Sequence, residues 1–174
     1  ISTGALRGVK RDIYEGGHRV PFIIRWPGKI KEGVVSDETI SQVDLMSTIA
    51  AITGAQYEKS AAVDSYNLSP VIFSEDYKSP LREATVQNTK VDKYAIRRGD
   101  WVLIDTNTGH HSKYPKGHLE KYGFHAVDKK AAGLLYNLKN DVGQKVDLYD
   151  KYPEVVKELR TLLKSYRENG RSIE

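Results

Sequence analysis

The chain has 174 residues, and its 27 Lys and Arg against 23 Asp and Glu give a formal net charge of +4. A hydrophobic fraction of 39%, a charged fraction of 29% and the lack of cysteine fit one globular domain, and they exclude disordered, collagen-like and coiled-coil chains, disulfides and thiolate zinc sites. No apolar run approaches the roughly 20 residues of a bilayer span, so no membrane partner is expected.

The first predicted element is the apolar run Val20-Pro21-Phe22-Ile23-Ile24-Arg25-Trp26, which turn residues bound on both sides. Such a run is typical of a strand buried on both faces, as in a parallel sheet. Farther along, Asp44 can cap a helix that Gly54 ends. The apolar positions of that helix lie on one side, and they are Leu45, Met46, Ile49, Ala50 and Ile52. Strand and helix together resemble one unit of an α/β layer.

The second half of the chain has an antiparallel pattern. Short β-type runs at 84–89, 94–97, 101–104 and 134–138 are separated by polar turns, and Arg98-Gly99-Asp100 predicts a hairpin. In the run 94–97, Tyr94 and Ile96 are expected on one face, and Ala95 and Arg97 on the other. From Pro153 to Asn169-Gly170 an apolar stripe at helical spacing predicts a helix. The stripe consists of Val155, Val156, Leu159, Leu162, Leu163 and Tyr166.

A polar segment between Asp105 and Gly133 contains His110, His111, His118 and His125. Imidazoles can bind metals, but gaps of seven and six residues match no usual ligand spacing, so an exposed loop is favoured and no metal site is predicted. Substrate contact is a third interpretation of the same histidines.

Charge and glycine are densest at Arg7-Gly8-Val9-Lys10-Arg11-Asp12 and Tyr14-Glu15-Gly16-Gly17-His18-Arg19. Paired glycines permit close backbone approach, and the cations point to an anion. The competing interpretation is a solvated turn held by a Glu15–Arg19 ion pair, which composition alone favours.

No stretch of the sequence forms a self-contained catalytic apparatus. There is no G-x-S-x-G elbow, no phosphate loop and no H-E-x-x-H. Lys93, Arg97 and Arg98 beside Tyr94 and Trp101 have the composition of a nucleic-acid surface, but the low net charge and interspersed acids argue against one, so no nucleic-acid partner is expected.

Residues 6–30 contain three short motifs in order, Leu6-Arg7-Gly8-Val9-Lys10, Tyr14-Glu15-Gly16-Gly17-His18-Arg19-Val20-Pro21 and Trp26-Pro27-Gly28. With these motifs the segment closely resembles the sulfatase family. Sulfatases carry L-R-G-x-K, Y-E-G-G-x-R-V-P and W-P-G in this order. The resemblance continues through Ser41-Gln42-Val43-Asp44-Leu45-Met46-Ser47-Thr48, where Ser47 replaces the usual proline, and through 94–101, 135–141 and 152–154.

The resemblance implies an α/β fold: the end of an alkaline-phosphatase-like catalytic domain over residues 1–80, then a small antiparallel sheet with a packed C-terminal helix over residues 81–174. It also implies a formylglycine nucleophile and a calcium ion whose motifs lie upstream of this chain. Ser79-Pro80-Leu81-Arg82 has the wrong spacing for the C/S-x-P-x-R motif of the family.

Lys10 matches the family lysine that contacts the sulfate group, so the resemblance makes it the catalytic candidate. Candidates for substrate binding at the pocket rim are Asn88, Arg97, His110 and His111. The turn around Glu15 is assigned to shaping the floor of the pocket.

The leading hypothesis is the C-terminal segment of a periplasmic or secreted bacterial sulfatase that acts on a sulfated small molecule or glycan. This segment is expected to be inactive without the N-terminal part of the same protein. The alternatives are a free-standing sulfated-glycan-binding module and a phosphatase or phosphonate hydrolase of the same superfamily.

Overall fold

The structure is a computed structural model that describes residues 3–78, 80–90, 92–124 and 130–173. The chain forms two compact units, one of residues Ile1–Val20 and Val86–Ser165, the other of Pro21–Thr85 and Tyr166–Glu174. The helices are α1 (Glu15–His18), α2 (Leu45–Thr53), α3 (Ser69–Ile72), α4 (His118–Lys121) and α5 (Pro153–Asn169), with 3-10 turns at Gln42–Asp44 and Lys59–Ala62. The strands are β1 (Thr85–Lys90), β2 (Lys93–Arg98), β3 (Trp101–Ile104) and β4 (Leu134–Asn137).

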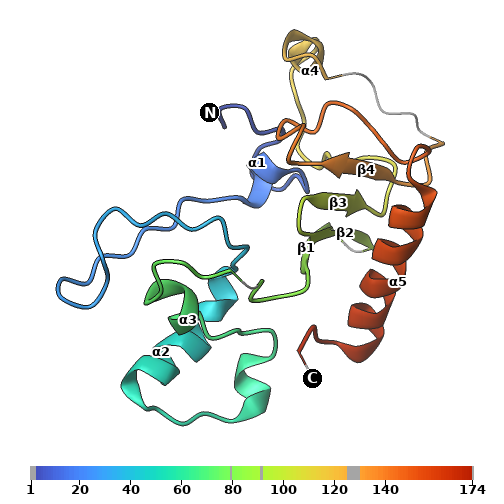
Figure 1. Cartoon of the computed structure of the whole chain (residues 1–174). Coiled ribbons are helices and arrows are strands. Elements are labelled where there is room, and N and C mark those ends of the chain that lie inside the picture. Colours follow the sequence, from blue (N-terminus) through green and yellow to red (C-terminus); the bar gives the residue numbers. More distant parts are fainter. Residues whose placement is uncertain (1–2, 79, 91, 125–129, 174) are drawn as a thin grey trace. The chain divides into compact units, whose positions relative to one another are not determined.

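The sheet of the first unit has the strand order β1-β2-β3-β4, as Figure 1 shows. Strands β2 and β3 pair antiparallel with Ala95 opposite Ile104, and β3 and β4 pair antiparallel with Val102 opposite Tyr136. Gly99 turns the β2–β3 hairpin with a φ of 56°, a left-handed conformation that favours glycine. The predicted antiparallel strands and their hairpin are therefore confirmed.

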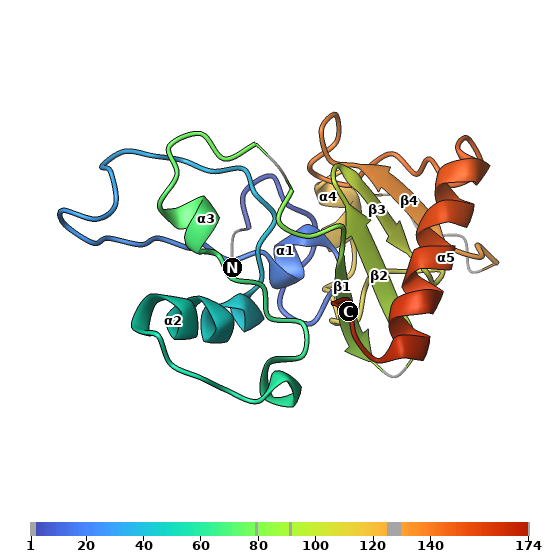
Figure 2. The same ribbon diagram turned by 60° about the horizontal axis from the view of Figure 1, so that its bottom comes forward.

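Helix α5 covers one face of this sheet (Figures 1 and 2). Its buried residues are Val156, Leu159 and Leu163, three members of the predicted apolar stripe. At the edge of the same layer, the Trp101 ring lies 5.1 Å from the Tyr152 ring, and Arg98 pairs with Glu158 at 2.5 Å. The predicted C-terminal helix is therefore confirmed in both its position and its apolar face.

The opposite face of the sheet is covered by a segment from the start of the chain. Ile13 and Tyr14 are almost completely buried there. They belong to one apolar cluster with sheet residues that alternate along the strands, Ala95, Val102, Ile104, Leu134 and Tyr136, and with Leu138. Because side chains alternate across a strand, this face also carries Arg97, as the sequence pattern predicted.

The second unit is held by the buried pair Asp44–Arg82. The Asp44 carboxylate also accepts hydrogen bonds from the backbone N–H groups of Ser41 at 2.7 Å and Tyr66 at 3.0 Å. Asp44 thus stands at the N-cap of α2 as predicted, but its carboxylate forms no cap bond to that helix. Gly54 ends α2 in the left-handed conformation with a φ of 73°, as expected.

The prediction of a buried strand at 20–26 is wrong. The run 20–26 is not a strand, and Val20, Phe22, Ile23, Ile24 and Trp26 are exposed. A strand buried on both faces needs hydrogen-bonded neighbours on either side. Among the described residues, the strands pair only within the antiparallel sheet of the other unit.

Helix α2 is present as predicted, but of its five predicted apolar positions only Ala50 is buried. Its buried residues are Ser47, Thr48 and Ala50, whereas Leu45, Met46, Ile49 and Ile52 are exposed. Thr48 explains this orientation, because its hydroxyl donates to the Asp44 carbonyl at 2.6 Å and accepts from the Leu68 N–H at 2.8 Å. These hydrogen bonds direct the polar side of α2 inward.

Nowhere in the described part of the chain does a helix combine the length and apolar character needed to cross a bilayer.

Replacement of Leu159 by Ala tests the packing of α5 against the sheet. Leu159 is 2% exposed, so its loss should leave a cavity and lower the free energy of unfolding by about 2–5 kcal/mol. The matched control is Leu162→Ala in the same helix, where a half-buried side chain is removed and a clearly smaller loss is expected. Urea denaturation followed by circular dichroism measures both. Equal losses for the two variants would contradict this packing.

Candidate functional site

The segment 7–18 is folded tightly on itself, and its two adjacent glycines make this possible. A Cβ atom on Gly17 would lie 2.0 Å from the Asp12 carbonyl oxygen, and one on Gly16 would lie 2.5 Å from the Gly8 carbonyl oxygen. The Gly16 N–H donates to the Arg7 carbonyl at 2.7 Å. The close backbone approach predicted from the paired glycines is therefore real, and the backbone that approaches belongs to residues 7–12.

Lys10 lies in a turn whose ends are joined twice. The Asp12 N–H donates to the Val9 carbonyl at 2.9 Å, and the Val9 N–H donates to Asp12 Oδ2 at 3.1 Å. Arg11 follows Lys10 with a φ of 82°, a conformation that costs energy for a residue other than glycine. The Lys10 side chain is exposed, and among the described residues no carboxylate pairs with its ammonium. The turn therefore presents a free cation from a fixed backbone.

The Asp12 carboxylate joins this turn to the loop that follows β3. Its Oδ1 accepts hydrogen bonds from the N–H groups of His111 at 2.8 Å and Ser112 at 2.9 Å, and its Oδ2 accepts one from the Tyr114 hydroxyl. The Ser112 hydroxyl donates to the Lys10 carbonyl at 2.8 Å. Two segments about 100 residues apart in the sequence thus form one polar cluster.

Burial alone would raise the pKa of Asp12, but contacts with four neighbours hold it well below its usual range. These neighbours are the His110 ring, the Ser112 N–H, the Tyr114 hydroxyl and the His111 N–H. Asp12 is therefore a carboxylate at neutral pH.

Arg7 is a buried cation held by neutral groups. Its guanidinium donates to the Gln144 carbonyl at 2.8 Å, contacts His110 Nε2 at 3.1 Å and lies over the Tyr14 ring at 4.0 Å. Because a guanidinium can only donate, Nε2 of His110 accepts this hydrogen bond. Nδ1 of the same ring lies 3.6 Å from Asp12 Oδ2, too far for a hydrogen bond, and has no hydrogen-bond partner among the described residues. The His110 ring therefore lies between the Arg7 cation and the Asp12 anion.

Glu15 is the second buried carboxylate of the segment, and its predicted ion pair with Arg19 is present at 3.8 Å. It also contacts His18 at 3.6 Å and Arg97 at 3.4 Å, while its N–H donates to Gln144 Oε1 at 2.8 Å. Burial would raise the pKa of Glu15, but His18 and the two arginines keep it low. The turn is therefore a buried network rather than the solvated turn favoured by composition.

Four residues were expected at a substrate rim, and the structure distributes them unequally. His110 and His111 lie in the Asp12 cluster, and of these two only His111 is exposed. Arg97 contacts Glu15 and donates from Nε to the Gly99 carbonyl at 2.9 Å. Asn88 donates to the carbonyls of Lys90 and Lys93 at 2.8 and 3.0 Å, so its amide closes the turn between β1 and β2.

The histidine loop contains the short helix α4, and His118 stacks on Tyr114 with ring centroids 5.1 Å apart. His125 and Ser79 lie outside the described residues. Within the described part of the chain, no three His, Asp or Glu side chains gather where they would hold a metal ion. The residues that the structure describes therefore do not fit a calcium site.

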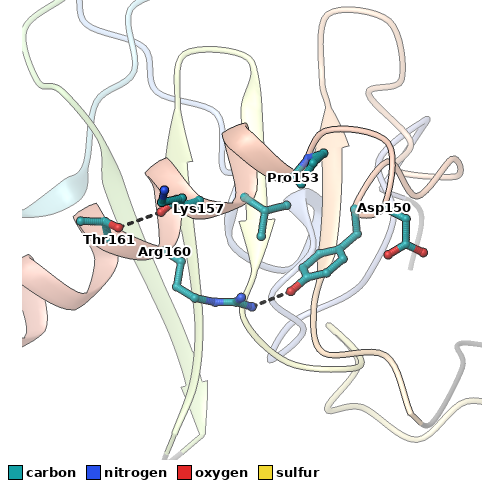
Figure 3. Close-up of a pocket in the computed structure, with 7 residues that line it drawn as sticks. Asp150, Pro153, Lys157, Arg160 and Thr161 are labelled. Atoms are coloured by element: carbon teal, nitrogen blue, oxygen red, sulfur yellow. Dashed lines mark hydrogen bonds between the residues drawn. The ribbon is translucent and has the colours of Figure 1, made fainter.

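A pocket in the first unit lies beside α5, away from the Asp12 cluster. Its lining includes Tyr149, Lys157, Arg160 and Thr161 (Figure 3). Arg160 donates to the Tyr149 hydroxyl at 2.9 Å and pairs with Asp105 at 2.8 Å, and Thr161 donates to the Lys157 carbonyl at 2.8 Å. These groups hold the helix in place, and nothing in the pocket points to chemistry.

The sequence analysis did not single out four residues that organise this site, Asp12, Gln144, Ser112 and Tyr114. Asp12 was visible only as one charge in a cluster, and Gln144 belonged to no predicted element or motif. Gln144 is completely buried and has a φ of 52°. Since their partners lie about 100 or more residues away, no local pattern could have identified them.

Comparison with known proteins places this geometry in context. The sequence model of the Sulfatase family matches residues 2–55. The chain is 33% identical to N-acetylgalactosamine-6-O-sulfatase of Bacteroides thetaiotaomicron over 94% of its own length and 30% of that protein. It is 29% identical to human arylsulfatase A over 92% of its length and 32% of that protein. The chain thus spans about a third of the curated relatives it matches.

Solved structures agree with the sequence relatives. A Bacteroides thetaiotaomicron structure from work on the metabolism of multiple glycosaminoglycans matches 94% of this chain and 32% of its own, with a TM-score of 0.72 and 31% identity. Ps i-CgsB, solved with a neocarrahexaose, matches 92% of this chain and 31% of its own with a TM-score of 0.68, and at 20% identity it supports the fold alone. The α/β fold of this chain, with its antiparallel sheet and C-terminal helix, thus matches about a third of each of these structures.

Replacement of Gly17 by Ala tests the close packing of the segment 7–18. The added Cβ would overlap the Asp12 carbonyl, so we expect a loss of about 3 kcal/mol or more in the free energy of unfolding. Gly99→Ala is the control in the same unit, since open space surrounds Gly99 and only its positive φ costs about 1–2 kcal/mol. Thermal or urea unfolding compares the two. A Gly17→Ala loss smaller than that of Gly99→Ala would contradict this close approach.

The low pKa of Asp12 predicts an acid-dependent stability. Because the folded-state pKa lies below the unfolded value of about 3.9, the carboxylate stabilises the fold above about pH 5, and this contribution fades as the pH falls through 4 and below. Urea unfolding between pH 7 and pH 3 should show a flatter pH dependence for Asp12→Asn than for the wild type. Asp100→Asn, in the exposed hairpin turn, should retain the wild-type slope. Parallel slopes for wild type and Asp12→Asn would refute the assignment.

Proposed function

Because this chain belongs to the sulfatase family, we propose that it is the C-terminal part of an enzyme that hydrolyses sulfate esters. The observation that carries the proposal is the exposed Lys10 ammonium on a doubly closed turn, at the position where the family has its sulfate-contacting lysine. The names of the relatives favour sulfated carbohydrate as the substrate, since one is an N-acetylgalactosamine-6-O-sulfatase.

In the proposed reaction Lys10 stabilises negative charge. Cleavage of a sulfate ester concentrates charge on the sulfuryl oxygens and the leaving oxygen, and a fixed cation beside them lowers the barrier. The turn around Lys10 supports this role, because its backbone is tied at Val9, Lys10 and Asp12, so little reorganisation is needed during the reaction. Among the four rim candidates, His111 and Asn88 are exposed, and the Asn88 amide is bound to the carbonyls of Lys90 and Lys93. His111 is therefore the first expected to contact the substrate.

The remaining candidates have a supporting place in the proposal. Arg97 and Asn88 lie on the strands beside the site, with their polar atoms bound to Glu15, Gly99 and the β1–β2 turn. His110 is bound between Arg7 and Asp12. We propose that these residues shape the rim, and that substrates larger than a single sulfate group reach them.

The nucleophile and metal of the proposed enzyme belong to the rest of the protein. Formylglycine would supply the attacking oxygen and calcium would bind the sulfate group, and we place both outside this chain. In this proposal residues 1–80 end the catalytic domain and residues 81–174 form the C-terminal subdomain. The exposed apolar side chains at 22–26 and on α2 support it, because a soluble domain rarely leaves so much apolar surface uncovered.

We place the enzyme in the periplasm or outside the cell of a bacterium, where polymeric sulfated glycans are found. The bacterial relative named for N-acetylgalactosamine-6-O-sulfatase activity supports this placement. The net charge of +4 also suits a polyanionic substrate.

Lys10→Ala in the full-length protein tests the catalytic proposal. Loss of the cation should lower kcat by about 100- to 1000-fold, the range for one transition-state donor, without changing the unfolding midpoint. Turnover is measured with a fluorogenic aryl sulfate and by sulfate release from a sulfated N-acetylgalactosamine saccharide. Lys139→Ala, which removes an exposed lysine from the turn after β4, is the matched control and should leave kcat close to that of the wild type.

Two outcomes would refute the proposal. An undiminished kcat in Lys10→Ala would remove Lys10 from the site. Sulfatase turnover by residues 1–174 alone would show that the nucleophile does not lie elsewhere.

A further inference from the structure

We propose that Asp12 is a positioning residue of the active site, which holds the Lys10 turn and the loop 109–114 in one fixed arrangement. The inference rests on the proposed catalytic role of Lys10 and adds a residue that does not itself touch the substrate. We call the Lys10 turn, residues 9–12, and the loop 109–114 that carries His111 the two walls of the site. The inference predicts that loss of the Asp12 contacts loosens both walls at once.

The Asp12 carboxylate lies between the Lys10 turn and the loop 109–114 and binds both. Its side chain is completely buried, and its two oxygens serve different parts of the site. Oδ1 accepts the two backbone N–H groups of His111 and Ser112, and Oδ2 accepts the N–H of Val9 together with the Tyr114 hydroxyl. One carboxylate therefore satisfies donors from both walls.

The backbone on either side of Lys10 depends on these hydrogen bonds. The residue after Lys10, Arg11, has a φ of 82°, so the turn does not adopt its shape by intrinsic preference. Besides the backbone bond from the Asp12 N–H to the Val9 carbonyl, three hydrogen bonds that involve side chains hold it. They are the Val9 N–H on Asp12 Oδ2, the Ser112 hydroxyl on the Lys10 carbonyl, and the Thr89 hydroxyl on the Arg11 carbonyl. Two of these three pass through Asp12 or the loop that Asp12 holds.

An asparagine amide cannot replace the Asp12 carboxylate. Asparagine has one acceptor oxygen, and its NH₂ group only donates. In one orientation the amide oxygen faces His111 and Ser112, and the NH₂ group faces the Val9 N–H. In the flipped orientation the oxygen faces Val9, and the NH₂ group faces the N–H groups of His111 and Ser112. Either way Asp12→Asn leaves a buried backbone donor without an acceptor and separates the two walls.

The test compares Asp12→Asn with the wild type in the full-length protein. Steady-state kinetics on the aryl sulfate should show kcat lowered by about 10- to 100-fold with KM nearly unchanged, as expected for a cation displaced by about 1 Å. Amide hydrogen exchange should become about tenfold faster or more in both 8–12 and 109–114. Asp147→Asn is the matched control, since Asp147 Oδ1 also accepts two backbone N–H groups, those of Leu135 and Tyr149. It should change exchange near those residues and leave kcat unchanged.

Ser112 supplies a second variant that does not disturb the carboxylate. Ser112→Ala removes the hydroxyl that donates to the Lys10 carbonyl and should lower kcat, whereas Ser112→Thr retains a hydroxyl and should restore it. This recovery distinguishes positioning from a general loss of stability, which the larger threonine side chain would not repair.

The outcomes separate this inference from the proposed function. A kcat near wild type in Asp12→Asn, a loss confined to KM, or faster exchange in only one of the two loops would overturn the inference. A wild-type protein without turnover on any sulfate ester would refute the proposed function, and the exchange data would then still decide whether Asp12 couples the two loops.

Discussion

The docking of residues 7–15 onto one face of the antiparallel sheet is the constraint on which the site depends. Tyr14 is the centre of this contact. Its ring packs with the sheet and lies 4.0 Å from the Arg7 guanidinium, and its hydroxyl accepts a hydrogen bond from the Gly109 N–H at 3.2 Å. A Cβ on Gly109 would lie 2.7 Å from that ring, so the histidine loop passes Tyr14 as closely as a backbone can. The loop and the lysine turn are therefore placed by the same side chain.

This packing determines which charges are available to a ligand. Asp12 and Glu15 are buried and occupied by internal donors, and Arg7 is enclosed by neutral acceptors and aromatic rings. Buried charges are costly unless they are bound in this way, and each then stiffens the backbone around it. Lys10 and His111 are on the same two segments but are exposed. The buried ions thus build the framework, and the exposed Lys10 and His111 side chains remain accessible to a ligand.

The sequence predicted what depends on local pattern and missed what depends on distant partners. Strands β2 and β3, their Gly99 turn and the apolar stripe of α5 follow from spacing within a few residues, and all are present. The run 20–26 has the local pattern of a buried strand, but a strand exists only with paired neighbours, and none of the described strands pairs with it. The site residues Gln144 and Ser112 have no local signal, because their partners are Arg7, Glu15 and Lys10 at the other end of the chain.

The continuous motif at 7–30 is divided between the two compact units, with residues up to Val20 folding with the sheet and Pro21 onward with the second unit. Because residues up to Val20 fold with the sheet, the sheet helps to set the geometry around Lys10. If the sheet were only an appended rim, the geometry around Lys10 would be set by residues close to it in sequence. Instead Ser112, Tyr114 and the β3–β4 face supply the contacts that hold the lysine turn. The antiparallel sheet is therefore the scaffold of the proposed catalytic lysine, and a substitution in it reaches the chemistry through Tyr14 and Asp12 without contacting the substrate.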